Sequence, residues 1–148
     1  MVEFALILPL LLTILLGVIE FGQAFNNKNE LTNLANQAMR YAEVNQCAPC
    51  NSASSSIETY IPTTADTGDL KANTTVCFST PSGTTTTQAI GAPITVKVTA
   101  PFNWLNYLGL GASTTISTQV TGRLDVAYVG TGYQGTPTGD QYTLRASC

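Results

Sequence analysis

The stretch MVEFALILPLLLTILLGVIEFGQAF, residues 1–25, decides the architecture of this chain of 148 residues. Sixteen uncharged residues, from Phe4 to Ile19, lie between Glu3 and Glu20, and no later segment resembles them. As a helix this run covers about 24 Å, and apolar neighbours extend it toward the roughly 30 Å of a hydrocarbon core. The run therefore predicts a helix that can span a thin or locally adapted bilayer.

The flanks of the run argue against a secretory signal peptide. Such a peptide has Lys or Arg ahead of its apolar run and a small-residue cleavage site behind it. Here Glu3 precedes the run and Glu20-Phe21-Gly22-Gln23 follows it. An ordinary single-pass anchor explains the length but not Glu3, because a carboxylate at membrane depth is costly unless it is paired. We therefore expect Glu3 to have a partner.

After Glu20 the same helix is predicted to continue as an amphipathic one, since apolar residues recur at spacings of three and four. These residues are Phe21, Ala24, Phe25, Leu31, Leu34, Ala35, Ala38 and Ala42. We expect one helix over residues 2–44, roughly 60–65 Å long, apolar all round in its first half and with a single buried stripe in its second. Residues 1–44 thus form the first predicted domain, a stalk that carries a head.

Three residues in this helix favour bending or close approach. Pro9 lacks the N–H that would bond to the Ala5 carbonyl, so we expect it to kink the helix or loosen one turn. Gly17 and Gly22 have low helix propensity and no side chain, so subunits could approach closely there. Functional bending and merely tolerated packing are both compatible with these residues.

Residues 45–148 are predicted to form the second domain, a disulfide-stabilised α+β head. Asn51 or Ser52 can cap one short helix that runs to about Ile61, and Pro62 helps to end it. After a turn at residues 68–73, Thr and Ser alternate with apolar residues in segments 74–79, 94–99 and 115–127, and residues 141–146 add an edge strand. This period of two is typical of a small Thr-rich antiparallel sheet with one wet face.

The same alternation predicts the core of the head, which comprises Ile94, Val96, Val98, Ile116, Val120, Leu124 and Val126. Gly122 falls among them and is expected to mark a bulge or a close approach. Residues 101–111 are too apolar for an exposed connection, so they either cover the end of the sheet or pack on a neighbouring molecule. We therefore expect Trp104 to be substantially buried.

Four cysteines, Cys47, Cys50, Cys77 and Cys148, lie outside the apolar run, in a head that would be exported. In an oxidising compartment they predict two structural disulfides, whose connectivity is one of three pairings. Cys47 and Cys50 also have the CxxC spacing of a thiol redox site, but no βαβ pattern surrounds them. A four-cysteine zinc site is disfavoured, because the other two cysteines are far apart in the sequence.

Composition excludes several classes of function. The chain has no His, the commonest general base and metal ligand, so histidine-based catalysis is excluded and no cofactor or metal is expected. Six basic residues against nine acidic ones leave no basic stripe for phosphates, so nucleic acid is not an expected partner. Asn73-Thr74-Thr75 is a glycosylation sequon in a cell with the required machinery, and otherwise a solvated polar segment.

Three segments resemble the TadE-like pseudopilins of the tight-adherence (Tad) pilus system, within the type IV pilin superfamily. Residues 1–25 are similar to the N-terminal helix of that family, and LTNLANQAMRYAEV (31–44) is similar to its small-residue helix leaving the membrane. The third segment, ITVKVTAPFNWLNYLGLGASTTISTQVTGRLD (94–125), is similar to its Thr-rich strand pair. The resemblance extends over about residues 1–127, is weakest between 46 and 92, and has its most specific motif at the N-terminus.

The resemblance implies assembly roles for Glu3, Phe4, Pro9, Gly17 and Glu20. In the family an inner-membrane peptidase removes a basic leader, and the acid at the fifth mature position corresponds to Glu3, so either two residues precede Met1 or processing differs. A buried carboxylate is tolerable beside a cation, and in a bundle of identical helices a neighbour's α-amine would serve and set the axial register. The alternative is an acid favoured by the helix dipole or placed at the membrane surface.

We therefore expect a non-enzymatic structural subunit of an extracellular Tad-type filament, which assembles through its N-terminal helix. The expected partners are copies of the chain, the inner membrane before assembly, the pilus assembly machinery and the prepilin peptidase. A minor pseudopilin, or a membrane-anchored binding module that stays near the membrane, is the alternative. A membrane-tethered thiol oxidoreductase at Cys47 and Cys50 comes third.

Overall fold

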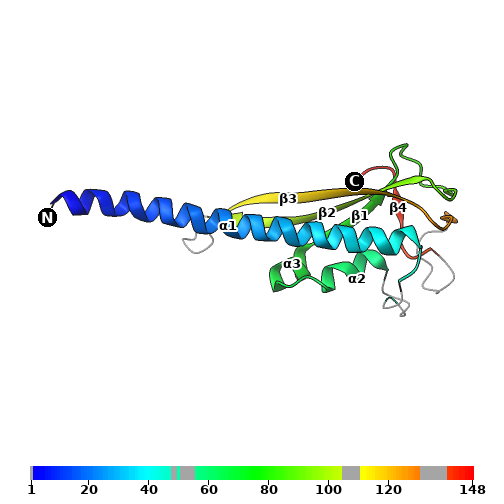
Figure 1. Ribbon diagram of the computed structural model, residues 1–148, viewed down its shortest axis with the longest axis horizontal. Coiled ribbons are helices and arrows are strands. Elements are labelled where there is room, and N and C mark those ends of the chain that lie inside the picture. The colour runs from blue at the N-terminus through cyan, green and yellow to red at the C-terminus, as the bar shows by residue number, and fades with distance from the viewer. Residues whose placement is uncertain (1, 48–49, 51–55, 105–110, 131–139) are drawn as a thin grey trace.

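A computed structural model of the chain describes residues 2–47, 50, 56–104, 111–130 and 140–148, without the side chains of Val2, Glu3 and Ala5. It begins with one long helix, α1 (Val2–Glu43), whose N-terminal part extends beyond the rest of the molecule (Figure 1). Its 42 residues correspond to about 63 Å. The predicted continuous stalk helix is confirmed, and it passes through Pro9 without a break.

The end of α1 is fixed by Asn45, whose φ of 46° places it in the left-handed region. The amide of Asn45 donates to the Ala42 carbonyl and that of Gln46 to the Tyr41 carbonyl, the two bonds of a Schellman motif. The Asn45 side chain also donates to Asp140 Oδ1 at 3.0 Å and accepts from the Gln141 amide. The C-terminal part of the chain thus holds the residue that stops the helix.

The head combines two short helices with a four-stranded sheet. Its elements are α2 (Ile57–Thr63), α3 (Gly68–Asn73), β1 (Thr75–Ser79), β2 (Pro93–Trp104), β3 (Ala112–Arg123) and β4 (Leu144–Arg145). The strand order is β3-β2-β1-β4, with antiparallel β1/β2 and β2/β3 pairs. The α+β class is confirmed, but β4 runs parallel to β1, so the sheet is mixed rather than purely antiparallel.

The head has two short helices where the sequence predicted one. Ser56 caps α2 by accepting from the Thr59 amide, and Pro62 is the penultimate residue of that helix, while the expected caps Asn51 and Ser52 lie outside the described residues. The expected turn at 68–73 is α3, whose Leu70 is buried in the core. Docking of this one apolar side chain outweighs the poor helix propensity of Gly and Asn at the ends of α3.

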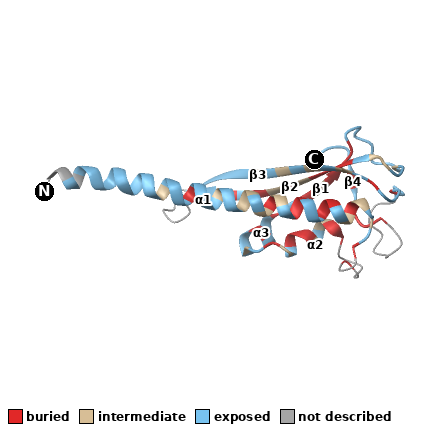
Figure 2. Ribbon diagram, in the orientation of Figure 1, coloured by how far each residue is buried: buried red, intermediate tan, exposed pale blue. Residues whose placement is uncertain are grey.

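All three helices cover one face of the sheet, α1 over β3 and β2, and α2 and α3 over β1 and β2 (Figures 1 and 2). Ile94, Val96 and Val98 are fully buried beneath them, as predicted. On the other face Thr75, Ser117 and Gln119 are exposed, which confirms the wet face. The sheet is therefore one wall of a two-layer core.

The end of β3 departs from the predicted core. Leu124 is buried, and Ile116 and Val120 are partly buried against the core, but Val126 is 45% exposed. The strand stops at Arg123, after which the amides of Asp125 and Val126 turn to donate to the Glu43 carbonyl. The strand period therefore no longer applies at Val126.

The second half of α1 belongs to the core of the head. Its buried residues are Leu31, Leu34, Ala35, Ala38, Met39 and Ala42. Gly122 is the close approach that the sequence predicted, because a Cβ there would lie 2.5 Å from Glu43 Oε1 and 2.7 Å from Met39 Sδ. The predicted stripe was wrong at its start, since Phe21 and Phe25 are 66% and 60% exposed.

The apolar segment after residue 100 is partly strand. Residues 101–104 extend β2 and pair with 112–115, so the connection is shorter than predicted. Trp104 is half-buried and packs edge-to-face on Phe102, with ring centroids 4.9 Å apart. Residues 105–110 of the predicted connection lie outside the described residues.

Two disulfides, Cys47–Cys50 and Cys77–Cys148, use all four cysteines. The first closes the segment after α1, and its two side chains are buried in the core. The second ties the C-terminal residue to β1. Both have the character of structural cross-links, and the buried Cys47–Cys50 pair lacks the exposure that reactive thiols require.

Candidate assembly surface

The first half of α1 is exposed along almost its whole length (Figure 2). The large exposed residues are Phe4, Leu6, Ile7, Leu8, Leu10, Leu11, Leu12, Ile14, Leu15, Val18, Ile19, Phe21 and Phe25. Within α1 the most hydrophobic 18-residue window has a mean hydropathy of 2.1, and only 6% of that window is buried. By length and composition this helix can cross a membrane, and it is not the buried core helix of a globular domain.

Leaving this surface in water is costly. Removal of a large aliphatic or aromatic side chain from water contributes about 1.5–3 kcal/mol, and more than ten such side chains are exposed here. The head makes no use of them, since its core starts at Leu31. The helix therefore needs another apolar environment, either lipid or other helices.

The predicted assembly residues occupy different environments on α1. Phe4 is 77% exposed, Pro9 is exposed within the helix, and a Cβ at Gly17 would meet no atom within 4 Å. Glu3 lies in the first turn, and its carboxylate is outside the described residues. Phe4, Pro9 and Gly17 thus share the open surface of the stalk, while Glu20 does not.

Glu20 is 6% exposed, although Ile19 and Phe21 beside it are 47% and 66% exposed. It precedes Leu31 by eleven residues, which is three helical turns to within about 20°, so it continues the face that packs on the sheet. The eleven-residue spacing between Glu20 and Leu31 can be read from the sequence, but the apolar pattern predicted Phe21 and Phe25 as the start of the buried stripe instead. The head-facing side of α1 begins with a carboxylate rather than with an aromatic ring.

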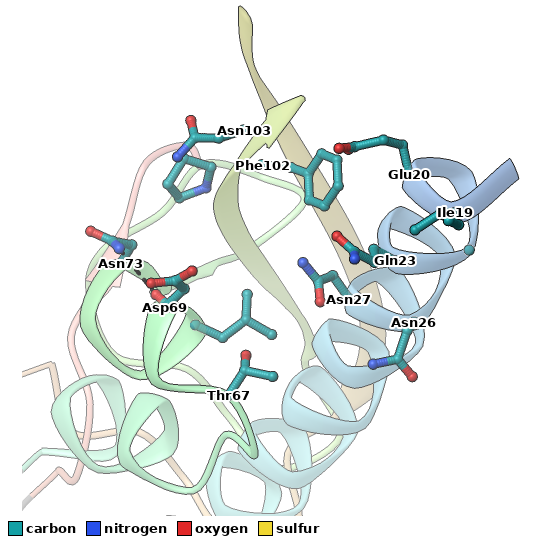
Figure 3. A pocket seen from close by; sticks show the side chains of 13 residues that line it. Ile19, Glu20, Gln23, Asn26, Asn27, Thr67, Asp69, Asn73, Phe102 and Asn103 are labelled. Carbon is teal, nitrogen blue, oxygen red and sulfur yellow. Dashed lines mark hydrogen bonds between the residues drawn. The ribbon is translucent and has the colours of Figure 1, made fainter. Parts of the chain in front are cut away.

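A cleft of about 630 Å³ opens beside Glu20, between α1, α3 and the end of β2 (Figure 3). Side chains from α1 form one wall, and Thr67, Asp69 and Asn73, at and within α3, form the opposite wall. Phe102 and Asn103 of β2 close the side between them, and the Glu20 carboxylate is turned toward the Phe102 ring. Sequence reasoning missed this cleft, because its walls come from three separated segments.

The cleft contains buried polar atoms without partners. Glu20 Oε2 and Thr67 Oγ1 are both buried and make no hydrogen bond, whereas buried polar groups in proteins are normally paired. None of the described residues that line the cleft is basic, and two, Glu20 and Asp69, are acidic. The cleft therefore has the character of a site for a group that carries positive charge and hydrogen-bond donors.

The sequence also raised a metal site, a glycosylation site and a thiol site as possibilities. The described residues contain no cluster of acids and cysteines that could hold a metal. Asn73 is exposed at the end of α3 and donates to the Asp69 carbonyl, so its side chain is ordered by the helix it terminates. The four cysteines are all bonded, so none is a thiol at the surface.

Residues 1–40 match the family model described as TadE-like protein. The N-terminal helix thus carries the signature of the TadE-like family. The matched residues are nearly the whole of α1, so the family signature lies on the exposed helix and on the stripe that packs in the head. Comparison with curated proteins and with solved structures gave no match.

The match with the TadE-like family indicates involvement in Tad pilus assembly. The match ends at residue 40, and the head with its cleft and disulfides lies beyond it. The features of the head that bear on function therefore have to be argued from their own geometry.

Proposed function

We propose that this TadE-like protein is a structural subunit of a Tad-type pilus filament. Its apolar helix holds it in the inner membrane before assembly and packs among the helices of other copies afterwards. The observation that carries the proposal is that residues 4–19 are exposed all round while the same helix continues into a folded core at Leu31. One surface then suits two apolar environments in turn, lipid first and a helical bundle second.

The partners follow from this cycle. The precursor would meet the prepilin peptidase and the assembly machinery at the inner membrane, and the assembled subunit would display its head on the outside of an extracellular filament. Two disulfides suit a head exported to an oxidising compartment. The role is structural, with the helix as the polymerising element and the head as the outer layer.

The test is immunoelectron microscopy of filaments sheared from cells that express the chain, with mass spectrometry of the purified material. Label along the whole length of filaments made mainly of this chain is the expected result. Label restricted to filament tips, or a chain that stays monomeric in the membrane fraction, would contradict a major subunit and favour the minor pseudopilin or anchored module.

A second test removes the charge of Glu3. If that carboxylate pairs with a neighbour's α-amine in the bundle, Glu3→Gln leaves a buried cation unpaired, at a cost of several kcal/mol for each subunit contact. We expect Glu3→Gln and Glu3→Ala to accumulate in the membrane with folded heads and few or no filaments. Thr85→Ser, in an exposed loop of the head, should assemble normally. Filaments of normal yield from Glu3→Gln would show that this charge does not set the register.

A further inference from the structure

We propose that the cleft beside Glu20 receives Arg40 of a second copy, so that neighbouring α1 helices pack in parallel with a stagger of twenty residues. The inference rests on the proposed function, since it specifies how copies meet. It starts from the cleft itself, where Glu20 is 6% exposed and its Oε2 has no partner. A carboxylate in this state is an incomplete ion pair, and its missing half is a cation.

The shape and lining of the cleft favour a guanidinium. A volume of about 630 Å³ is far larger than a metal ion needs, and the described residues hold no cluster of metal ligands. The Phe102 ring beside Glu20 offers a face on which a planar guanidinium can stack. On the opposite wall, the Asp69 carboxylate and the Thr67 hydroxyl can accept hydrogen bonds from the remaining N–H groups of a guanidinium.

Within this chain Arg40 is the arginine that helix geometry brings to the cleft. It is exposed, and it follows Glu20 by twenty residues, which is about 30 Å along the axis and about 200° around it. Glu20 lies on the side of α1 that faces the head, and Arg40 therefore lies on the opposite side. A parallel copy beneath the head, displaced by about 30 Å toward the N-terminal end, would direct its Arg40 at Glu20.

The same stagger matches two more pairs. On the head-facing side of the stalk Thr13, Gly17 and Glu20 follow each other at i, i+4 and i+7, and this is its least apolar stripe. Twenty residues later Asn33, Gln37 and Arg40 repeat that spacing and are all exposed, with Gln37 on the flank of α1, where it accepts a hydrogen bond from Thr64 of its own head at 3.3 Å. The stagger places Asn33 against Thr13 and Gln37 against Gly17, where there is open space for a long side chain.

This contact joins two different surfaces, so each copy offers both halves of it. Such a heterologous contact repeats without closing on itself and produces an open helical polymer. It also leaves the apolar sides of residues 4–19 free for further neighbours. The stagger therefore adds a polar register to a bundle held together by apolar packing.

Charge exchange tests the pair in cells that make filaments. Glu20→Arg and Arg40→Glu alone should each lower the yield of sheared filaments at least tenfold, and the double variant should recover to within about twofold of wild type. Arg123→Glu, which reverses an exposed cation elsewhere in the head, should have no effect. Normal yield from either single variant, or no recovery in the double variant, would overturn the pairing.

A cysteine cross-link tests the stagger independently, because all four native cysteines are already bonded. A chain with both Thr13→Cys and Asn33→Cys should give a ladder of dimers, trimers and higher oligomers on oxidation. The matched control pairs Thr13→Cys with Asn29→Cys, which is exposed on the outer side of α1 at a stagger of sixteen, and it should give none. A ladder from the control alone would contradict the stagger of twenty residues and indicate that of the control instead.

A stability measurement separates this role from a structural one. Glu20→Gln removes an unpaired buried charge, so the detergent-solubilised monomer should melt at the same temperature or higher while filaments are lost. A lower melting temperature would make Glu20 a structural residue of the head. If wild type itself forms no oligomers, the proposed function fails; if it does and the ladder and recovery are absent, only this contact fails.

Discussion

The two halves of α1 belong to one unbroken helix, but the first half is exposed and the second half packs against the sheet of the head. In residues 4–19 the large apolar side chains are exposed on every side, whereas in residues 31–42 a single stripe is buried against the sheet. The first half is more hydrophobic than the second, yet it contributes nothing to the core of the head. Hydrophobicity alone therefore does not say which half folds with the head; the periodicity of the apolar residues does.

The difference also teaches how one element can serve assembly and folding together. Because the helix runs without a break from the exposed half into the core, the stalk and the head are joined by a continuous helix rather than by a linker. Small residues make this tie close, with Ala35, Ala38 and Ala42 bringing α1 near the sheet and Gly122 receiving Met39 and Glu43. Substitutions in the two halves should consequently have separable effects.

The largest expected effect comes from one charge placed in each half. Leu31→Asp puts a carboxylate at a fully buried position and should destabilise the head by more than about 4 kcal/mol, enough to unfold it. Leu11→Asp, at a position 62% exposed, should change head stability by less than about 0.5 kcal/mol in detergent. Urea unfolding followed by Trp104 fluorescence measures both. Equal losses in the two variants would contradict the division of α1.

In cells, membrane insertion should be impaired more by Leu11→Asp than by Leu31→Asp. An Asp near the middle of the apolar run opposes membrane insertion by about 2.5–3.5 kcal/mol. Leu11→Asp should therefore be depleted from the membrane fraction. Retention of Leu11→Asp in the membrane at wild-type level would contradict the role of residues 4–19 as the anchor.

Loosening the head should affect the second half of α1 and leave the first unchanged. Cys77–Cys148 closes a loop across a separation of 71 residues, and Cys47–Cys50 one of 3. Chain entropy predicts losses of about 4 kcal/mol and about 2 kcal/mol when each pair is replaced by alanines. Hydrogen exchange should accelerate in residues 31–42 and stay constant in 4–19 of the detergent-bound chain. Hydrogen exchange that accelerates equally in both halves would contradict the view that only residues 31–42 fold with the head.

A smaller effect is expected from the two kinds of glycine. Gly122→Leu forces side-chain atoms into Met39 and Glu43 and should cost about 1–3 kcal/mol of head stability. Gly17→Leu meets open space in the single chain and should leave head stability unchanged or raise helix stability slightly. Thermal melts of the detergent-solubilised variants measure the difference. A stable Gly122→Leu head would mean that α1 and β3 are not closely packed.

The smallest expected effect is a dependence on pH at Glu58 of α2. Burial raises the pKa of Glu58 above 4.5, against the Thr143 amide, Arg145 and the Ser56 hydroxyl, which favour the charged form. A raised folded-state pKa means that its contribution to stability is full below pH 4.5 and is lost as the pH rises through the folded-state value. Glu58→Gln should remove this loss, and Asp125→Asn, at an exposed site, should retain it. A wild-type melting temperature that does not fall with pH in this window would contradict the burial of Glu58.

Local periodicity predicted much of this fold. The helix over residues 2–44, the buried trio Ile94, Val96 and Val98, and the close approach at Gly122 all follow from spacing within one element. Spacing failed where tertiary contacts decide. Phe21 and Phe25 fit the apolar pattern but lie about 100° and 140° around the helix from Glu20, which is on the side that the head buries.

The cleft lay beyond prediction for the same reason. Its walls come from α1, α3 and β2, and α3 itself depends on the docking of Leu70 rather than on a helical pattern. The parallel pairing of β4 with β1 likewise follows from how the C-terminal segment returns alongside β1, held by Asp140 at Asn45 and by Cys148 at Cys77. Contacts over such sequence separations leave no periodic signal in a single sequence.

Cryo-electron microscopy of the assembled filament is the most direct test of the central claim, that residues 4–19 serve contacts between copies while residues 31–42 serve the head of their own chain. The map should show a core of parallel α1 helices in which residues 4–19 contact only other copies. Residues 31–42 should still lie on their own sheet. A filament whose core is made of heads, or in which residues 31–42 have left their own sheet to pack with neighbours, would contradict it.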